Sequence, residues 1–173
     1  VYADSTLFDV LGLPIIAGNS KTALNQPRTV VITRRMALKY FHTSEAVGQT
    51  LLLNEHDPYR VTGVLEDLPH TSHLTADLYF SMVDHADSRE NSWLSHNYST
   101  YLLLKPGVSP ERVEGQIRKL FLQHAGPMIQ QWLGKRMAEL EATGSYIRYS
   151  LMAVPDIHLH SNRVDEMNPP GNI

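Results

Sequence analysis

The residues best suited to chemistry lie near the C-terminal end, where Asp156, His158 and His160 alternate with apolar residues. If this segment continues a strand over 146–154, the three side chains share one face, because successive strand residues point to opposite sides. Two imidazoles and a carboxylate are ligands that Zn²⁺ accepts, which makes these residues the candidate metal site. A polar strand face that meets solvent needs no ion, so we predict neither a bound metal nor a cofactor.

A second group contains the residue types of a Ser–His–Asp triad. His70 and His73 flank Ser72, and Asp67 and Asp77 lie nearby in the sequence. No Gly-x-Ser-x-Gly turn surrounds the serine, and triad geometry depends on the fold, not on closeness in sequence. The serine and the second histidine are better explained as turn residues that bond the backbone. We therefore predict no catalytic residues and no enzyme activity in this chain.

Composition excludes several classes of function. The net charge is −3, from 15 basic and 18 acidic residues, and no Lys/Arg block is present, so nucleic acid is not an expected partner. Arg34-Arg35, with Lys39 a turn later, is interpreted as a solvated helix face. The absence of cysteine excludes disulfides and thiolate metal sites. The glycines form no phosphate-binding loop, so ATP is not expected to bind this segment.

The chain reads as a piece of a longer protein. It starts without an initiator Met or a signal sequence. No stretch approaches the ~20 apolar residues that span a bilayer. We expect such a run shortly before residue 1 and another soon after residue 173 in the parent protein.

Hydrophobic periodicity predicts the elements that position these residues. In the first half we expect a helix over 4–11 that ends at Gly12, and a buried strand over 29–32. A helix capped by Thr33 should follow, with Met36, Ala37, Tyr40 and Phe41 on its inner face. Further expected strands cover 13–16, 50–54, 59–66 and 74–82, of which 50–54 and 59–66 form a hairpin.

In the second half, a polar loop over 85–97 should precede a strand over 100–105. A helix over 109–124 should end at Gly126-Pro127, and a second helix should bury Trp132. A long strand over 146–154 should continue to residue 160. The strands 100–105 and 146–154, with the helix 109–124, would form a split β-α-β unit.

This pattern predicts one α+β domain over residues 1–173, a mixed fold of two lobes. The larger lobe would contain 1–27 and 74–173, and a smaller strand-helix-hairpin lobe would contain 28–73. The tail over 166–173 is rich in proline and reads as a linker.

A series of short motifs runs in order along nearly the whole chain. They are Ser5-Thr-Leu-Phe8, Leu13-Pro-Ile-Ile-Ala-Gly18, Thr22-Ala-Leu24, Pro27, Val30-Val-Ile-Thr33, Ala37, Lys39-Tyr-Phe41, Gly48-Gln-Thr-Leu51, Val61-Thr-Gly-Val64, Asp67, Pro69, Ser72-His73, Thr100-Tyr-Leu-Leu-Leu-Lys105, Asp156-Ile-His-Leu159 and Gly171-Asn172. Together they resemble the MacB-like periplasmic core domain of FtsX/MacB-type (type VII) ABC transporter permeases. The chain departs from that family at His42, where a glycine usually follows Tyr-Phe.

The resemblance implies a domain inserted between the first two transmembrane helices of a permease, on the periplasmic face of the bacterial inner membrane. ATP would bind a cytoplasmic ATPase, and the permease would pair with a second permease copy. The domain would transmit ATP-driven movement across the membrane, which is called mechanotransmission, and would contact cargo or a periplasmic adaptor. No catalytic residues come with the family.

Two other functions stay open on the residues alone. A stand-alone periplasmic ligand-binding or sensor domain would need one deep pocket with converging polar groups, and the 85–97 segment with Trp93 and Tyr98 is where we would look for it. A metal-dependent hydrolase would use Asp156, His158 and His160.

Overall fold

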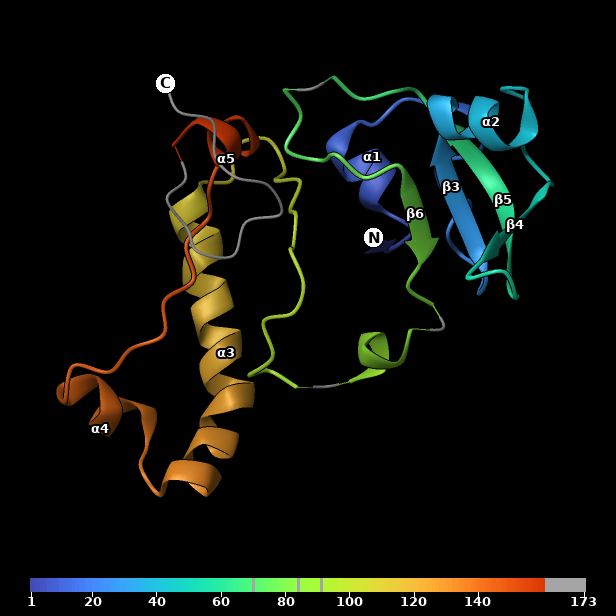
Figure 1. Ribbon diagram of the computed structural model, residues 1–173. Coiled ribbons are helices and arrows are strands. Elements are labelled where there is room, and N and C mark those ends of the chain that lie inside the picture. Colours follow the sequence, from blue (N-terminus) through green and yellow to red (C-terminus); the bar gives the residue numbers. More distant parts are fainter. Residues whose placement is uncertain (70, 84, 91, 161–173) are drawn as a thin grey trace. The chain divides into compact units, whose positions relative to one another are not determined.

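The structure of the chain, a computed structural model, describes residues 1–69, 71–83, 85–90 and 92–160, without the side chains of residues 158–160. The chain divides into two compact units (Figure 1). Of the described residues, the sheet unit contains those within 1–90, 101–103 and 157–160, and the helical unit contains 92–100 and 104–156. Each unit has a hydrophobic core of its own.

The sheet unit is built on one mixed sheet with the strand order β1-β6-β3-β5-β2, and β4 also pairs with β5. The neighbours β3 and β5 run parallel, and β6 runs antiparallel to β3. Both β2 and β4 run antiparallel to β5, and β1 runs parallel to β6. The strands are β1 (Tyr2–Ala3), β2 (Ile15–Gly18), β3 (Thr29–Thr33), β4 (Thr50–Leu53), β5 (Asp57–Leu65) and β6 (Leu78–Ser81).

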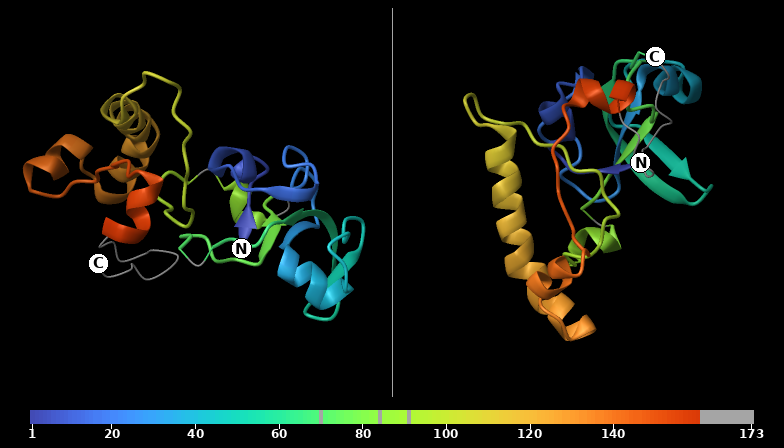
Figure 2. Two further views of the ribbon diagram at one scale, coloured as in Figure 1. Left: turned by 90° about the horizontal axis from the view of Figure 1, so that it is seen from above. Right: turned by 90° about the vertical axis from the view of Figure 1, so that its left-hand side faces the viewer.

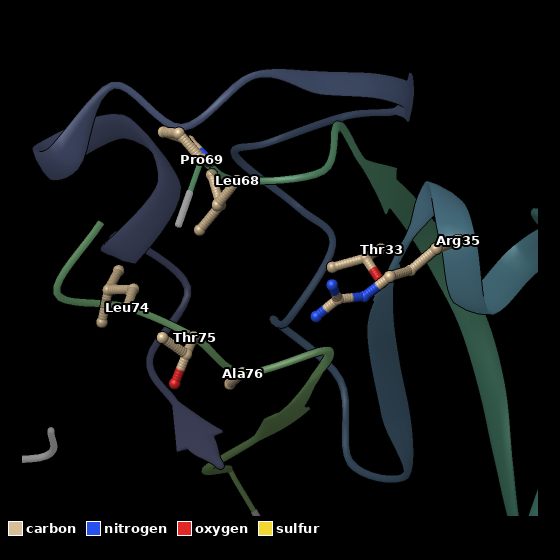
Figure 3. A pocket seen from close by; sticks show the side chains of 7 residues that line it. All are labelled: Thr33, Arg35, Leu68, Pro69, Leu74, Thr75 and Ala76. Atoms are coloured by element: carbon tan, nitrogen blue, oxygen red, sulfur yellow. The ribbon is translucent and has the colours of Figure 1, made fainter. Parts of the chain in front are cut away.

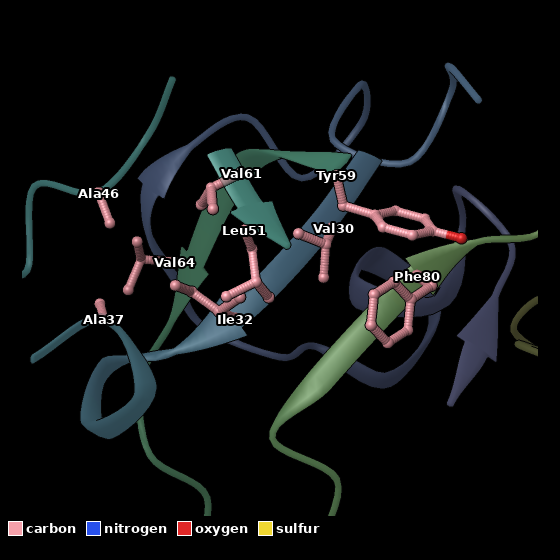
Figure 4. Packing of buried hydrophobic residues seen from close by; sticks show 9 residues of the cluster. All are labelled: Val30, Ile32, Ala37, Ala46, Leu51, Tyr59, Val61, Val64 and Phe80. Carbon is pink, nitrogen blue, oxygen red and sulfur yellow. The ribbon is translucent and has the colours of Figure 1, made fainter. Parts of the chain in front are cut away.

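Both faces of this sheet are covered. Val30 and Ile32 of β3 pack with Ala37 of the helix α2 (Arg34–Phe41), as Figure 4 shows. Val31 points to the other cluster, with Phe8 of the helix α1 (Leu7–Leu11). All five residues of β3 are buried, so the predicted buried strand is confirmed. Such a strand is a run of largely apolar, β-branched residues because neither face meets water.

The end of α2 explains how the chain accommodates its departure from the family pattern. His42 is the C-cap residue and has the left-handed conformation with a φ of 57°. Its backbone N–H donates to the carbonyl of Leu38 at 3.1 Å. Glycine is the usual residue at this position because it has no Cβ to strain the left-handed backbone. The helix therefore ends as in a glycine-capped helix, with histidine in the strained position.

The helical unit is organised by one long helix, α3 (Pro110–Leu133), which Figure 2 shows without interruption. The predicted start is confirmed, because the Ser109 hydroxyl accepts from the Arg112 N–H at 3.4 Å and a proline follows the cap. Phe121, Ala125 and Ile129 lie four residues apart and pack with Met137 of α4. The remaining helices are α4 (Met137–Ala142) in the helical unit, the 3-10 helix η1 (Ala86–Arg89) in the sheet unit, and α5 (Val154–His160), whose residues are divided between the two units.

Three predictions for the second half are wrong. The described residues 100–105 and 146–153 contain no strand, so the split β-α-β unit does not form. The helix does not end at Gly126-Pro127 but continues to Leu133, because the buried stripe of Phe121 and Ala125 continues past the proline to Ile129. Residues 154–160 form α5, with Pro155 in the first turn, where a missing N–H costs no helical hydrogen bond.

Smaller errors concern single side chains. Trp132 is 72% exposed, although its place on the stripe predicted burial. Tyr40 is half exposed, whereas its neighbours Met36 and Phe41 are partly buried against the core.

The bounds of two elements also differ from the prediction. The strand predicted over 74–82 contains only β6, and the first helix begins at Leu7. The Asp4 side chain accepts from the Thr6 N–H at 2.7 Å, so it closes a turn before that helix.

The two units divide the chain at different places from the predicted lobes. The segment 28–73 contains β3, β4 and β5, which share one sheet with β1, β2 and β6. These pairings join strands that are far apart in sequence. Local periodicity carries no information on such pairings, which is why the predicted lobe boundaries differ.

Candidate functional site

The connection between two strands, at one end of the sheet, contains the residues of triad type that the sequence analysis considered. Residues 66–69 and 71–77, here called the strap, connect β5 to β6. Because β3 and β5 are parallel, their carboxyl ends, Thr33 and Leu65, lie side by side. The strap therefore starts next to the point where β3 ends and α2 begins.

Charged residues tie both ends of the strap to that junction. Near its start, Glu66 lies 3.4 Å from the Arg34 guanidinium, and Asp67 accepts from the backbone N–H of Arg35 at 3.0 Å. At its end, Asp77 lies 2.6 Å from the Arg35 guanidinium and accepts from the Thr33 hydroxyl at 3.0 Å. Carboxylates near the first turn of a helix are favourable because its free N–H groups carry partial positive charge.

These two ion pairs differ in their carboxylates. The Asp77 side chain is 23% exposed and also accepts from the Thr33 hydroxyl, whereas the Glu66 side chain is 40% exposed. The two arginine side chains, Arg35 and Arg34, are similarly exposed, at 53% and 50%. An exposed pair contributes about 0–1 kcal/mol, so the pair of Arg34 and Glu66 adds little. We therefore expect Arg35 and Asp77 to fix the strap.

The strap borders a pocket on the sheet unit (Figure 3). Its cavity volume is about 40 Å³, room for a few water molecules. Small-molecule sites usually have about 300–1,000 Å³. This pocket therefore does not provide the deep binding site that a ligand-binding domain would need. Its lining residues are Thr33, Arg35, Leu68, Pro69, Leu74, Thr75 and Ala76.

Among the described residues, Ser72, Asp67 and Asp77 have contacts other than those of a triad. The Ser72 hydroxyl accepts from the Leu74 N–H at 3.1 Å, which confirms its interpretation as a turn residue. Asp67 and Asp77 bond α2 and the end of β3, as described above. The side chain of His73 lies 3.1 Å from the Tyr101 hydroxyl. His70 lies outside the described residues.

The contact between His73 and Tyr101 joins the strap to a short stretch of the chain. The two rings also lie 5.5 Å apart between their centroids. Residues 101–103 belong to the sheet unit, although the chain on both sides of them belongs to the helical unit. Burial raises the pKa of Tyr101, so its phenol keeps its proton near neutral pH.

A second tyrosine near the strap has an unusual environment. Tyr79 of β6 is fully buried, and its hydroxyl has no hydrogen-bond partner among the described residues. Burial, and then the charges of Asp77 and Tyr101, raise the pKa of Tyr79 from 10.0 to about 12. Its ring packs edge-on against Phe8 at 5.7 Å. The environment is suited to the ring and unfavourable for the hydroxyl.

The prediction that the candidate metal site lies on one face of a strand is wrong. Asp156, His158 and His160 lie on α5, so they do not alternate on a strand face. The side chains of the two histidines lie outside the described residues, so the expectation that no metal binds this candidate site stays a prediction. Within the described part of the chain, no three His, Cys, Asp or Glu side chains gather as metal ligands.

The glycine of the Val61-Thr-Gly-Val64 motif has a packing role. Gly63 faces Gly18 across the β2–β5 pair. A Cβ on Gly18 would lie 2.4 Å from the Thr62 carbonyl oxygen, and one on Gly63 would lie 3.2 Å from Val31. The motif therefore allows two backbones to approach closely, which only glycine permits.

Sequence reasoning missed the residues that hold the strap. Arg35 was interpreted as part of a solvated helix face, but its guanidinium and its backbone N–H both bind strap carboxylates. Tyr101 was placed on a strand that does not exist. No local signal could have found these contacts, because each joins residues 28 or more positions apart.

A family model agrees with the resemblance that the motifs suggest. The model of the MacB-like periplasmic core domain matches residues 1–120. No curated protein matches the chain. In the described part of the chain, no helix is both long enough and apolar enough to cross a membrane.

Two solved structures are similar to the chain. A crystal structure of a domain assigned to a permease protein from Porphyromonas gingivalis has 30% sequence identity and a TM-score of 0.60, over 71% of this chain and 58% of that one. The periplasmic region of MacB from Actinobacillus actinomycetemcomitans has 15% identity and a TM-score of 0.43, over 83% of this chain and 64% of that one. The chain thus spans about three-fifths of the length of each. With the family match over residues 1–120 and the similarity to the P. gingivalis domain, the chain belongs to the family of MacB-like periplasmic core domains.

Proposed function

We propose that the chain is the periplasmic domain of an ABC transporter permease and that it couples ATP hydrolysis in the cytoplasm to conformational change in the periplasm. The observation that carries this proposal is the family match over residues 1–120. The similarity to a domain assigned to a permease protein supports it. ATP would act on a separate cytoplasmic ATPase, and this domain would perform no chemistry.

The division into two units supports a mechanical role. The chain passes between the sheet unit and the helical unit four times, at 90/91, 100/101, 103/104 and 156/157. Several covalent connections transmit displacement of one unit to the other more directly than a single linker would. Mechanotransmission requires two global states that nucleotide binding favours differently. We propose that these states differ in the arrangement of the two units.

The proposed partners follow from this role. They are a cytoplasmic ABC ATPase, a second copy of the permease, and a periplasmic adaptor or cargo protein. The alternative, a stand-alone ligand-binding or sensor domain, would need a larger pocket than the one beside the strap, which has about 40 Å³.

The experiment measures the distance between the two units in the intact permease with its ATPase. Because this domain has no cysteine, Glu45→Cys and Lys119→Cys place spin labels at exposed positions of the sheet unit and the helical unit. Parent cysteines outside the domain would be replaced. Pulsed electron resonance then compares the nucleotide-free, ATP-bound and vanadate-trapped states.

We expect the distance distribution between the units to change with nucleotide. The matched control carries both labels in the sheet unit, at Lys21 and Glu45, and should give one distribution in all states. An unchanged distance between the units, in a permease that hydrolyses ATP, would contradict the proposal.

A further inference from the structure

Among the described residues, polar side chains of the strap contact both the β3–α2 junction and a second part of the sheet unit. At the junction, Asp67 and Asp77 bind Arg35. Between these carboxylates, His73 extends from the strap to Tyr101 at 3.1 Å. The strap therefore joins the N-terminus of α2 to residues 101–103.

Residues 101–103 are a natural point for this attachment. The helical unit includes Thr100 on one side of them and Leu104 on the other. A displacement of the helical unit would act on this stretch through two peptide connections. The hydrogen bond to His73 is a side-chain contact through which the pull can reach the strap.

We propose that the His73–Tyr101 contact is a latch that fastens residues 101–103 to the strap and couples the helical unit to the β3–α2 junction. The path runs from Tyr101 to His73, along the strap to Asp67 and Asp77, and from these carboxylates to Arg35. This inference adds a specific contact to the proposed function, and it rests on that function for what the latch transmits.

Hydrogen exchange followed by mass spectrometry tests the latch in the 173-residue chain. Tyr101→Phe removes the hydroxyl but keeps the ring, so the variant should fold. The strap contains amides that report on its opening, because the Ser72 N–H donates to the Pro69 carbonyl at 2.9 Å and the Leu74 N–H to the Ser72 hydroxyl at 3.1 Å. We expect strap peptides, distant in sequence from the substitution, to exchange about 2- to 10-fold faster, as the loss of one hydrogen bond predicts.

Peptides from the core of β3 and β5 should exchange as in the unaltered chain. The control Tyr40→Phe removes a hydroxyl from a half-exposed tyrosine of α2 and should leave the strap unchanged. A second variant, His73→Leu, removes the other partner. If both act through one bond, the double variant should exchange no faster in the region 71–77 than the more affected single variant.

Unchanged exchange in the strap of Tyr101→Phe would overturn the latch, and so would equal acceleration in the strap and in the core of β3 and β5, which indicates general destabilisation. These measurements use the chain without nucleotide or ATPase. If hydrogen exchange contradicts the latch, the spin-label test of the proposed function is unaffected. If the spin labels show no nucleotide-dependent movement, the exchange result for the His73–Tyr101 contact is likewise unaffected.

Discussion

Tyr79→Phe should stabilise the domain, although it alters a fully buried residue of the central sheet. The Tyr79 hydroxyl has no hydrogen-bond partner among the described residues. A buried polar group without a partner costs about 1–3 kcal/mol. Phenylalanine keeps the ring and its edge-on contact with Phe8. Since loss of the oxygen leaves a small void, we expect a net gain of about 1 kcal/mol in the free energy of unfolding near neutral pH.

The same substitution should change the response to alkaline pH. In the folded chain the pKa of Tyr79 is raised from 10.0 to about 12, chiefly by burial. The unfolded chain therefore loses this proton at a lower pH than the folded chain does. The unaltered domain loses stability as the pH rises from the unfolded pKa of 10.0 to the folded pKa of about 12. The difference in the free energy of unfolding between Tyr79→Phe and the unaltered domain should therefore increase by about 1 kcal/mol between neutral pH and pH 11, in favour of the variant.

Urea denaturation followed by far-ultraviolet circular dichroism measures both effects. Tryptophan fluorescence is less suitable, because Trp93 and Trp132 both lie in the helical unit. Tyr40→Phe, on the exposed side of α2, is the control and should change stability little at either pH. A loss of about 1 kcal/mol or more in Tyr79→Phe near neutral pH would refute the reasoning, since it would mean that the hydroxyl has a favourable partner. If the free energy of unfolding falls equally with pH in the variant and in the unaltered domain, the claim that burial raises the pKa of Tyr79 is refuted.

Two further predictions concern backbone approach and surface exposure, and urea denaturation checks both. Gly18→Ala should destabilise by about 3 kcal/mol or more, because the new Cβ would lie 2.4 Å from the Thr62 carbonyl oxygen. Gly48→Ala, which also has a positive φ but no atom within 4 Å of the new Cβ, should cost only about 1 kcal/mol, and equal losses would contradict the argument from close approach. Trp132→Ser should change stability by about 0.5 kcal/mol or less, because the indole is 72% exposed. Phe121→Ala should cost about 3–5 kcal/mol in the same helix, and a large loss for the tryptophan would show that it is buried in solution.

The parts of the fold that sequence predicted are those that local patterns determine. The β-branched run of β3, the β4–β5 hairpin and the serine-proline start of α3 each have a signal within a few residues. Apolar content alone misled the prediction at 100–105 and 146–153, because strands need partners and no periodicity supplies them. The break predicted at Pro127 failed because burial of a continuous apolar stripe outweighed one lost hydrogen bond.

The candidate site was predicted only in part. The strap residues were singled out, and Ser72 was correctly assigned to a turn. Their partners were not found, because Arg35 and Tyr101 reach the strap from distant segments. Ion pairs and hydrogen bonds between segments depend on the strand order, which a single sequence does not reveal.

The placement of the strands early in the chain has a consequence for biosynthesis. The six strands of the described residues lie within residues 2–81, and the helical unit begins after residue 90. Domains generally fold as units during synthesis, N-terminal parts first. The strands therefore emerge before α3 does, in whichever compartment the domain folds, and they can pair before the helical unit is complete.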